Sequence, residues 1–236
     1  MTREKSADAK QSGTVSTPLH FDFDLNEDSV LSFLRTGDSS REEIQAISQN
    51  ASLMKSRKVR LALAAHPRTP RRISLKLIRE FYTFDLMRFA LAPAAAPDLK
   101  HIADELLTSR VGSITLGERI SLARRSSTRV AEALLLDTEA RVWEAALENP
   151  RLTEAGVVKA LQSGKAEPAF VKAVCCHLKW SLRKNVRRSL LLNEHTPLGR
   201  ALEFACDLPP AQLRDMLDTS RLPEKIKNCL RKPLCD

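Results

Sequence analysis

A twelve-residue pattern that occurs three times constrains this chain more than any other feature of its sequence. The copies read VRLALAAHPRTP at 59–70, VWEAALENPRLT at 142–153 and VRRSLLLNEHTP at 186–197. In each copy a valine begins a run rich in leucine or alanine, both strong helix formers, and the run ends at His66, Asn149 or Asn193. Asn and His are enriched among the non-glycine residues that adopt the left-handed conformation in which many helices end. We therefore predict a helix, a sharp corner and a second helix at each copy.

Proline and threonine residues around these corners mark where the next helix begins. Pro67 and Pro150 directly follow the corner residues and prevent the first helix from continuing. A threonine hydroxyl at an N-cap accepts a hydrogen bond from a free backbone amide of the following helix. We expect this role for Thr69, Thr153 and Thr196.

The composition favours a chain built from short helices. Leucine and alanine supply 62 of the 236 residues, aromatic residues make up 5%, and there are seven glycines. From residue 27 onward apolar residues recur at three- and four-residue spacings, which is the spacing of a helix face. Ser40 and Glu43 have the spacing of a capping box ahead of one such helix. The sequence predicts an all-α fold of about fifteen helices, with no strand.

Two weaker copies of the pattern lie between the strong ones. If the leucines of the five copies are equivalent, their spacings are 28, 31, 25 and 44, for Leu63, Leu91, Leu122, Leu147 and Leu191. The longest gap leaves room for an extra helix around residues 167–178. A single helix pair cannot bury its apolar face alone, so consecutive pairs must stack as in an α-solenoid. The alternative is an irregular multi-helix bundle whose corners share the same local chemistry.

The stretch ALENPRLTEAGVVKAL, with its relatives ALAAHPRTP and LLLNEHTP, resembles the leucine-rich repeat variant and HEAT-like α-solenoid proteins of bacteria. The resemblance covers about residues 50–205 and rests on a short, leucine-dominated motif. It implies a curved, right-handed stack of helices that binds another macromolecule, and it brings no catalytic residues. We expect residues 25–236 to form a single helical repeat domain. Residues 1–24 are polar and lack helical periodicity, so we expect a disordered tail.

The formal net charge of +9 is concentrated in two basic blocks. Residues 51–100 hold 11 basic and three acidic side chains, and residues 151–200 hold ten and three, whereas 1–50 and 101–150 are net acidic. Such blocks are typical of surfaces that bind phosphate backbones, acidic lipid or an acidic partner, and also of solvated arginine-rich helix faces. The candidate binding residues are Arg57, Lys58, Arg60, Arg68, Arg71, Arg72, Lys179, Trp180, Arg183, Lys184, Arg187 and Arg188.

Repeat position and helix polarity favour some of these residues in particular. Arg60 and Arg187 occupy the same position of the pattern, so stacked repeats are expected to project them in the same sense. Arg71 and Arg72 follow Pro70, in a first helical turn whose free amides and dipole favour an anion.

The sequence between the two blocks argues against a continuous basic track. It carries several carboxylates on helical faces, namely Glu132, Glu139, Glu144 and Glu148. Aromatic stacking partners are scarce. Trp143 replaces the arginine of the other two strong copies and can be exposed, and Trp180 is expected at a helix start. For both tryptophans, filling the core between repeats is the more common role.

Two functions follow from these features. The first is a non-enzymatic helical-repeat scaffold that binds another protein, and the second is a nucleic-acid binder that uses the two basic blocks. The sharpest form of the second is a HEAT-like DNA glycosylase, for which Trp143 with Asp137 or Glu144 would be the nearest candidates. We found no motif of a known catalytic, metal or cofactor site.

The cysteines and the hydropathy exclude further classes of protein. The five cysteines are odd in number, form no Cys-x-x-Cys pair and include adjacent residues, which argues against a disulfide framework or a zinc module. They are Cys175, Cys176, Cys206, Cys229 and Cys235. No apolar run is long enough to span a bilayer, and we expect a cytoplasmic protein without a cofactor.

Overall fold

The structure is a computed structural model that describes residues 26–36 and 39–231. These residues form fifteen α-helices, two short 3₁₀ helices and no strand, which confirms the all-α prediction for the part of the chain described. The tail predicted at residues 1–24 lies outside the described residues. The α-helices are α1 (Glu27–Thr36), α2 (Arg41–Gln49), α3 (Arg57–Ala65), α4 (Arg71–Glu80), α5 (Thr83–Leu91), α6 (Pro97–Arg110), α7 (Leu116–Arg125), α8 (Thr128–Leu134), α9 (Ala140–Leu147), α10 (Glu154–Gln162), α11 (Pro168–Cys176), α12 (Lys184–Leu191), α13 (Leu198–Cys206), α14 (Pro210–Thr219) and α15 (Glu224–Arg231).

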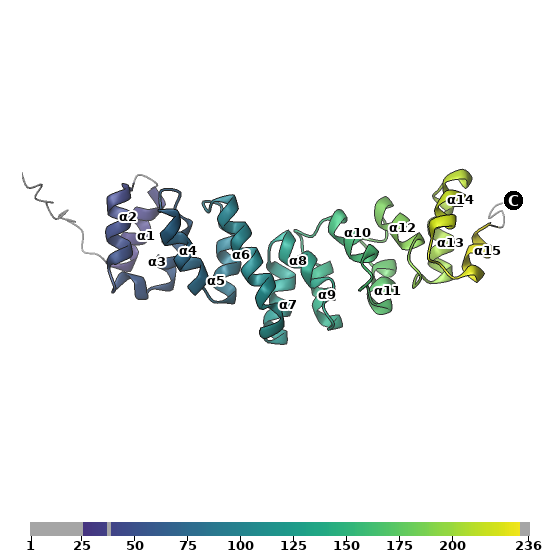
Figure 1. Ribbon diagram of the computed structural model, residues 1–236, viewed down its shortest axis with the longest axis horizontal. Helices are drawn as coiled ribbons and strands as arrows, with labels where there is room; N and C mark the ends of the chain where they lie inside the picture. Colours follow the sequence, from purple (N-terminus) through teal and green to yellow (C-terminus); the bar gives the residue numbers. More distant parts are fainter. Residues whose placement is uncertain (1–25, 37–38, 232–236) are drawn as a thin grey trace, which may run out of the picture.

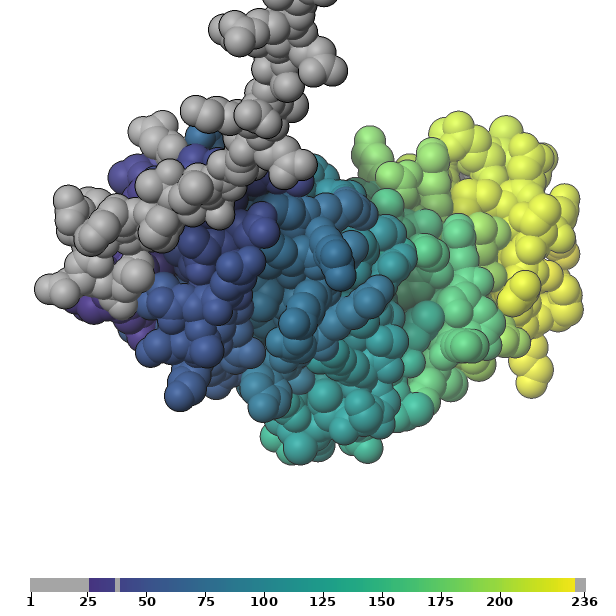
Figure 2. Space-filling view, turned by 60° about the vertical axis from the view of Figure 1, so that its left-hand side comes forward, coloured from purple at the N-terminus to yellow at the C-terminus, as the bar shows by residue number. Residues whose placement is uncertain are grey.

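The helices follow one another from α1 to α15 along the long axis of the molecule (Figure 1). Odd-numbered helices contact the next odd-numbered helix from α1 to α11, and we call this series the odd row. Even-numbered helices do the same from α4 to α12, and we call this series the even row. On the face shown in Figure 2, successive segments of the chain cover successive parts of the surface. Each hairpin therefore packs mainly against its neighbours in sequence.

One continuous apolar cluster extends along the helices. Val59 and Leu63 lie one turn apart on α3, and both are fully buried. Phe89 of α5, Leu122 of α7 and Phe170 of α11 occupy the same interior. Three- and four-residue spacing places such residues on one helix face, so each short helix gains its stability by covering the face of its neighbours.

Side chains at several corners join one hairpin to the hairpin before it, as Asn149 at the end of α9 shows. Its Oδ1 accepts a hydrogen bond from the backbone N–H of Arg151 at 2.8 Å. Its Nδ2 donates to the carbonyl oxygens of Ala123 and Ser126, at 2.8 and 3.3 Å, where α7 ends. Asn149 is fully buried. One side chain therefore shapes its own corner and also satisfies carbonyls of the preceding odd-row helix.

The even row has the same arrangement. Asn193, after α12, accepts from the backbone N–H of His195 at 3.0 Å and donates to the carbonyl of Leu161 at the end of α10, also at 3.0 Å. Ser220, after α14, donates to the carbonyl of Leu191 at the end of α12 at 2.7 Å. Corners along both rows thus link helix ends that are about one hairpin apart.

The predicted corners are confirmed, but the backbone conformation predicted for them is wrong at His66. His66 is the residue at which α3 ends, and its φ of −70° and ψ of 133° are extended rather than left-handed. Its Nδ1 accepts a hydrogen bond from the backbone N–H of Arg68 at 3.2 Å. His66 therefore ends α3 in an extended conformation, and its side chain bonds to the backbone two residues ahead.

The buried His66 gives the fold a dependence on pH. Burial and the Arg68 guanidinium lower the pKa of His66 below its ordinary value of 6.5. Below that value the unfolded chain takes up a proton that the folded chain resists, so we expect the free energy of unfolding to fall as the pH drops through 6.5. His66→Asn keeps a corner acceptor, as at Asn149, and should reduce this pH dependence. Urea unfolding at about pH 7.5 and about pH 5.5 measures it. If the variant and the parent lose equal stability between these two pH values, His66 is not the cause of the pH dependence.

The threonines next to the corners do not all act as predicted. Thr153 caps α10, which confirms its expected role. Thr69 and Thr196 are buried, and their hydroxyls donate to the carbonyls of Leu63 and Leu190, each at 2.6 Å. Prolines occupy the N-cap positions of the helices that follow them. Thr69 and Thr196 therefore close the preceding helix, and their predicted role as caps of the next helix is wrong.

The third strong copy of the pattern belongs to a different kind of corner. Copies 59–70 and 142–153 join an odd-numbered helix to an even-numbered one, whereas 186–197 joins α12 to α13. Arg60 accordingly lies on the odd row and Arg187 on the even row, so the predicted common direction of these two residues does not follow from their repeat position. The extra helix predicted around 167–178 is present as α11, and it accounts for the gap of 44 residues before Leu191.

Candidate functional site at the α11–α12 corner

Three cations of the first basic block, Arg57, Lys58 and Arg71, are held in ion pairs with carboxylates on neighbouring helices. Arg57 on α3 donates to Asp85 Oδ2 on α5 through Nε and Nη2, at 3.1 and 2.7 Å. Lys58 Nζ lies 3.2 Å from Glu27 Oε1 on α1. These pairs run along the odd row in both directions from α3, so they bridge adjacent hairpins.

Among the candidate residues of this block, some contact protein groups and some have no ion-pair partner in the part of the chain described. Arg71 on α4 pairs with Asp98 on α6, and Arg68 Nη1 donates to the carbonyl of Ser39 at 3.1 Å. Arg60 is half-buried. Arg72 is exposed and has no ion-pair partner within the described ranges. The anion site predicted at Arg71 and Arg72 is therefore partly filled by the carboxylate of Asp98.

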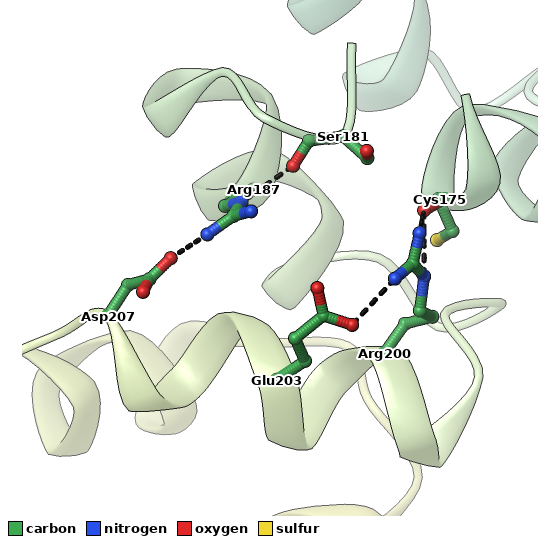
Figure 3. Close-up of polar contacts among 6 residues, drawn as sticks. All are labelled: Cys175, Ser181, Arg187, Arg200, Glu203 and Asp207. Carbon is green, nitrogen blue, oxygen red and sulfur yellow. Dashed lines mark hydrogen bonds and ion pairs between the residues drawn. The ribbon is translucent and has the colours of Figure 1, made fainter. Parts of the chain in front are cut away.

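In the second block Arg187 and Arg200 connect α11, α12 and α13 (Figure 3). Arg200 is not among the candidate binding residues predicted from the sequence. Arg187 donates to the carbonyl of Ser181 at 2.6 Å and pairs with Asp207 at the end of α13. Arg200 on α13 donates through Nε to the carbonyl of Cys175, at the end of α11, at 2.8 Å. Arg187 is thus a structural cation, and it is not available as a free binding group.

Both tryptophans fill the interior. Trp180 is 1% exposed, and its Nε1 donates to the carbonyl of Leu147 at the end of α9 at 2.9 Å. It lies in the corner before α12, which begins at Lys184, so its predicted place at a helix start is wrong. Trp143 packs edge-on against Phe170 with ring centroids 5.6 Å apart. The interpretation of both residues as core fillers is confirmed, and Trp180 presents no free ring face to a ligand.

The side chains on either side of Trp180 point outward. Leu178 is 88% exposed and Leu182 is 67% exposed. Arg183 and Lys184 follow at once, are exposed and have no ion-pair partner among residues 26–36 and 39–231. Lys179 Nζ lies 4.1 Å from the centroid of the Trp180 ring, with its side chain otherwise exposed. We name this exposed group the corner tip: Leu178, Lys179, Leu182, Arg183 and Lys184.

The backbone beneath the corner tip is held in place by several hydrogen bonds. His177 Nδ1 accepts from the backbone N–H of Lys179 at 3.2 Å, and His177 Nε2 lies 3.2 Å from Glu148 Oε1. The backbone N–H of Ser181 donates to the carbonyl of His177 at 3.0 Å. Together with the anchored Trp180 ring, these contacts fix the corner, so its exposed leucines are presented without the entropy cost of ordering a loop.

Two of the surface hollows lie in the part of the molecule from α7 onward. One, of about 350 Å³, spans the odd row from α7 to α11, and it is lined by both cations and carboxylates, among them Arg141 and Glu144. The other, of about 330 Å³, lies where α10 and α12 end. Neither is lined by the corner tip. The leucines of the corner tip are therefore exposed outside both of these hollows.

Of the residues considered for a glycosylase site, Glu144 is exposed and lines the hollow of about 350 Å³. Trp143 is buried, and Asp137 is held by Arg119, whose Nη1 lies 2.6 Å from Asp137 Oδ1. In the part of the chain that the structure describes, no group of three or more His, Cys, Asp or Glu side chains could hold a metal ion.

The described cysteines are free thiols. Burial, then the neighbouring Cys176, raises the pKa of Cys175 to about 11. Its thiol therefore stays protonated at neutral pH and is a poor nucleophile. Cys235 lies outside the described residues.

Sequence reasoning missed the leucines of the corner tip. Their four-residue spacing reads as a helix face that would be buried, whereas the backbone here forms turns. Adjacent cations at Lys179, Arg183 and Lys184 are the signal that could have marked both leucines as surface residues.

None of the helices in the described part of the chain combines the length and the apolar character that crossing a bilayer requires. The chain matches no protein-family model, no curated protein and no solved structure.

Proposed function

We propose that this chain is a non-enzymatic helical-repeat scaffold that binds other proteins in the cytoplasm. In this proposal the hairpins form a right-handed α-solenoid of degenerate repeats. Contacts between alternate helices along two rows, and corner side chains that join consecutive hairpins, support the stacking. Stacks of this kind leave long faces uncovered, and such faces suit binding to another macromolecule.

The observation that favours a protein partner over a nucleic acid is that several candidate cations form ion pairs between hairpins. Arg57, Lys58, Arg71 and Arg187, all candidates for phosphate contact, pair with carboxylates on other helices. A phosphate track needs a continuous set of free cations, because its affinity comes from the release of many counterions.

The even row also separates the free cations of α4 from those of α12. Carboxylates occur on the helices between them, for example Glu105 on α6 and Glu132 on α8. This mixture of both charge signs favours a protein partner over a nucleic acid.

Photo-crosslinking in cells tests this function. A photo-reactive amino acid in place of Lys76 or of Lys159, which are exposed on α4 and α10, samples the even row. We expect discrete adducts that nuclease leaves intact and protease removes. A photo-reactive residue at Leu63, which is fully buried on α3, is the control and should give none. Adducts that nuclease removes would instead favour the nucleic-acid binder.

A further inference from the structure

We propose that the corner tip binds the surface of an anionic phospholipid bilayer. Leu178 and Leu182 insert into the interface between headgroups and acyl chains, and Lys179, Arg183 and Lys184 contact lipid phosphates. This inference goes beyond the scaffold function and stands independently of it. It would place the stack of helices on a membrane by one corner.

The two leucines supply the apolar part of this surface. They are 88% and 67% exposed, four residues apart and on either side of the buried Trp180. Exposing two large apolar side chains at one place is unfavourable in water in proportion to their area. Moving both into an apolar environment is therefore a driving force for binding.

The shape of the corner favours a bilayer as that environment. An extended peptide or a partner helix binds in a groove, and the corner tip lines neither of the two hollows described above. A bilayer interface accepts a protruding apolar side chain without a preformed pocket. Trp180 and the hydrogen bonds of His177 hold the corner in the form that exposes both leucines.

The charges around the leucines favour anionic lipid in particular. Arg183 and Lys184 have no ion-pair partner among the described residues, and Arg188, one turn further on α12, has none either. Two carboxylates, Glu148 and Glu154, lie nearby, where they bond to His177 and to the backbone N–H of Asn185 and keep their charge. Four exposed cations outnumber them, namely Lys179, Arg183, Lys184 and Arg188. The local field is therefore positive, and a negatively charged membrane surface attracts it.

Co-sedimentation of the full chain with large unilamellar vesicles tests the proposal. We expect binding to phosphatidylcholine vesicles that contain about 30% phosphatidylserine, and much weaker binding to phosphatidylcholine alone. The double variant L178E/L182E should lose at least about tenfold in partition coefficient, because two carboxylates replace the inserted side chains. The double variant R183Q/K184Q should lose about fivefold for each cation removed.

Two further variants keep the test decisive. Tyr82→Glu, at an exposed aromatic side chain between α4 and α5 (67% exposed) and away from the corner tip in sequence, is the control and should bind vesicles as the parent does. Leu178→Trp should bind at least as well as the parent, and its fluorescence should shift to the blue on binding. All of these side chains are exposed, so unchanged circular dichroism and melting temperature should confirm folding.

Three outcomes would overturn the proposal. The first is no binding to phosphatidylserine vesicles by the folded parent. The second is a loss of less than about twofold in L178E/L182E, which would leave only non-specific electrostatic attraction. The third is stronger binding of the same cations to duplex DNA, without any dependence on Leu178 and Leu182.

Discussion

Replacing Trp180 by alanine is expected to lower the free energy of unfolding by about 4 kcal/mol. The ring is 1% exposed and lies where α9, α11 and α12 meet, so its removal leaves a large cavity. The change also leaves the carbonyl oxygen of Leu147 without its 2.9 Å hydrogen bond from Nε1. Urea denaturation followed by circular dichroism measures the loss.

Two matched variants separate the causes of this effect. Trp180→Phe keeps most of the ring but removes the donor, so we expect a loss of about 2 kcal/mol. Leu178→Ala, two residues away but 88% exposed, should change stability by less than about 0.5 kcal/mol. A Trp180→Ala variant that is no less stable than Leu178→Ala would contradict the interior position of Trp180.

Asn149→Ala is expected to lower the free energy of unfolding by about 3 kcal/mol. The substitution removes the bonds to the carbonyls of Ala123 and Ser126 and the acceptor for the backbone N–H of Arg151. The site is fully buried, so water cannot replace these partners freely. Asn149→Asp should cost at least as much, because it keeps the acceptor but buries a charge and cannot donate.

Asn50 provides the matched control for the corner itself. Its Oδ1 accepts from the backbone N–H groups of Ser52 and Leu53, at 3.0 and 3.3 Å, within its own turn. No bond from Asn50 to another hairpin is found among the described residues. Asn50→Ala should therefore cost only about 1 kcal/mol, the value of the turn alone. Equal losses at Asn50 and Asn149 would show that the link between hairpins contributes nothing.

The local features of the fold could be predicted from the sequence because they depend on residues close in the chain. Ser40 and Glu43 form the expected capping box, with the backbone N–H of Glu43 donating to Ser40 Oγ at 3.2 Å. The helix ends at His66, Asn149 and Asn193 follow from the same short-range chemistry. The gap of 44 residues before Leu191 likewise indicated the extra helix that the structure shows as α11.

Whether each cation is ion-paired or free could not be predicted from the sequence, because its partner lies far away in the chain. Arg57 is tied to Asp85, 28 residues later, and Arg71 to Asp98. Nothing in the local pattern indicates which helix end will lie opposite an arginine.

The third copy of the pattern, at 186–197, joins an even-numbered helix to an odd-numbered one, and this too could not be predicted from local sequence. Its place in the stack depends on the number of helices that precede it, and the corner residues alone do not reveal that number.

Hydrogen exchange of the Asn149 side-chain amide tests most directly the claim that corner side chains join consecutive hairpins. Its Nδ2 group donates to the carbonyl oxygens of Ala123 and Ser126 on the preceding hairpin, and the side chain is fully buried. We predict that its protons exchange far more slowly than those of an exposed side-chain amide, because exchange requires separation of the two hairpins. Exchange at the rate of an exposed side-chain amide would contradict the account.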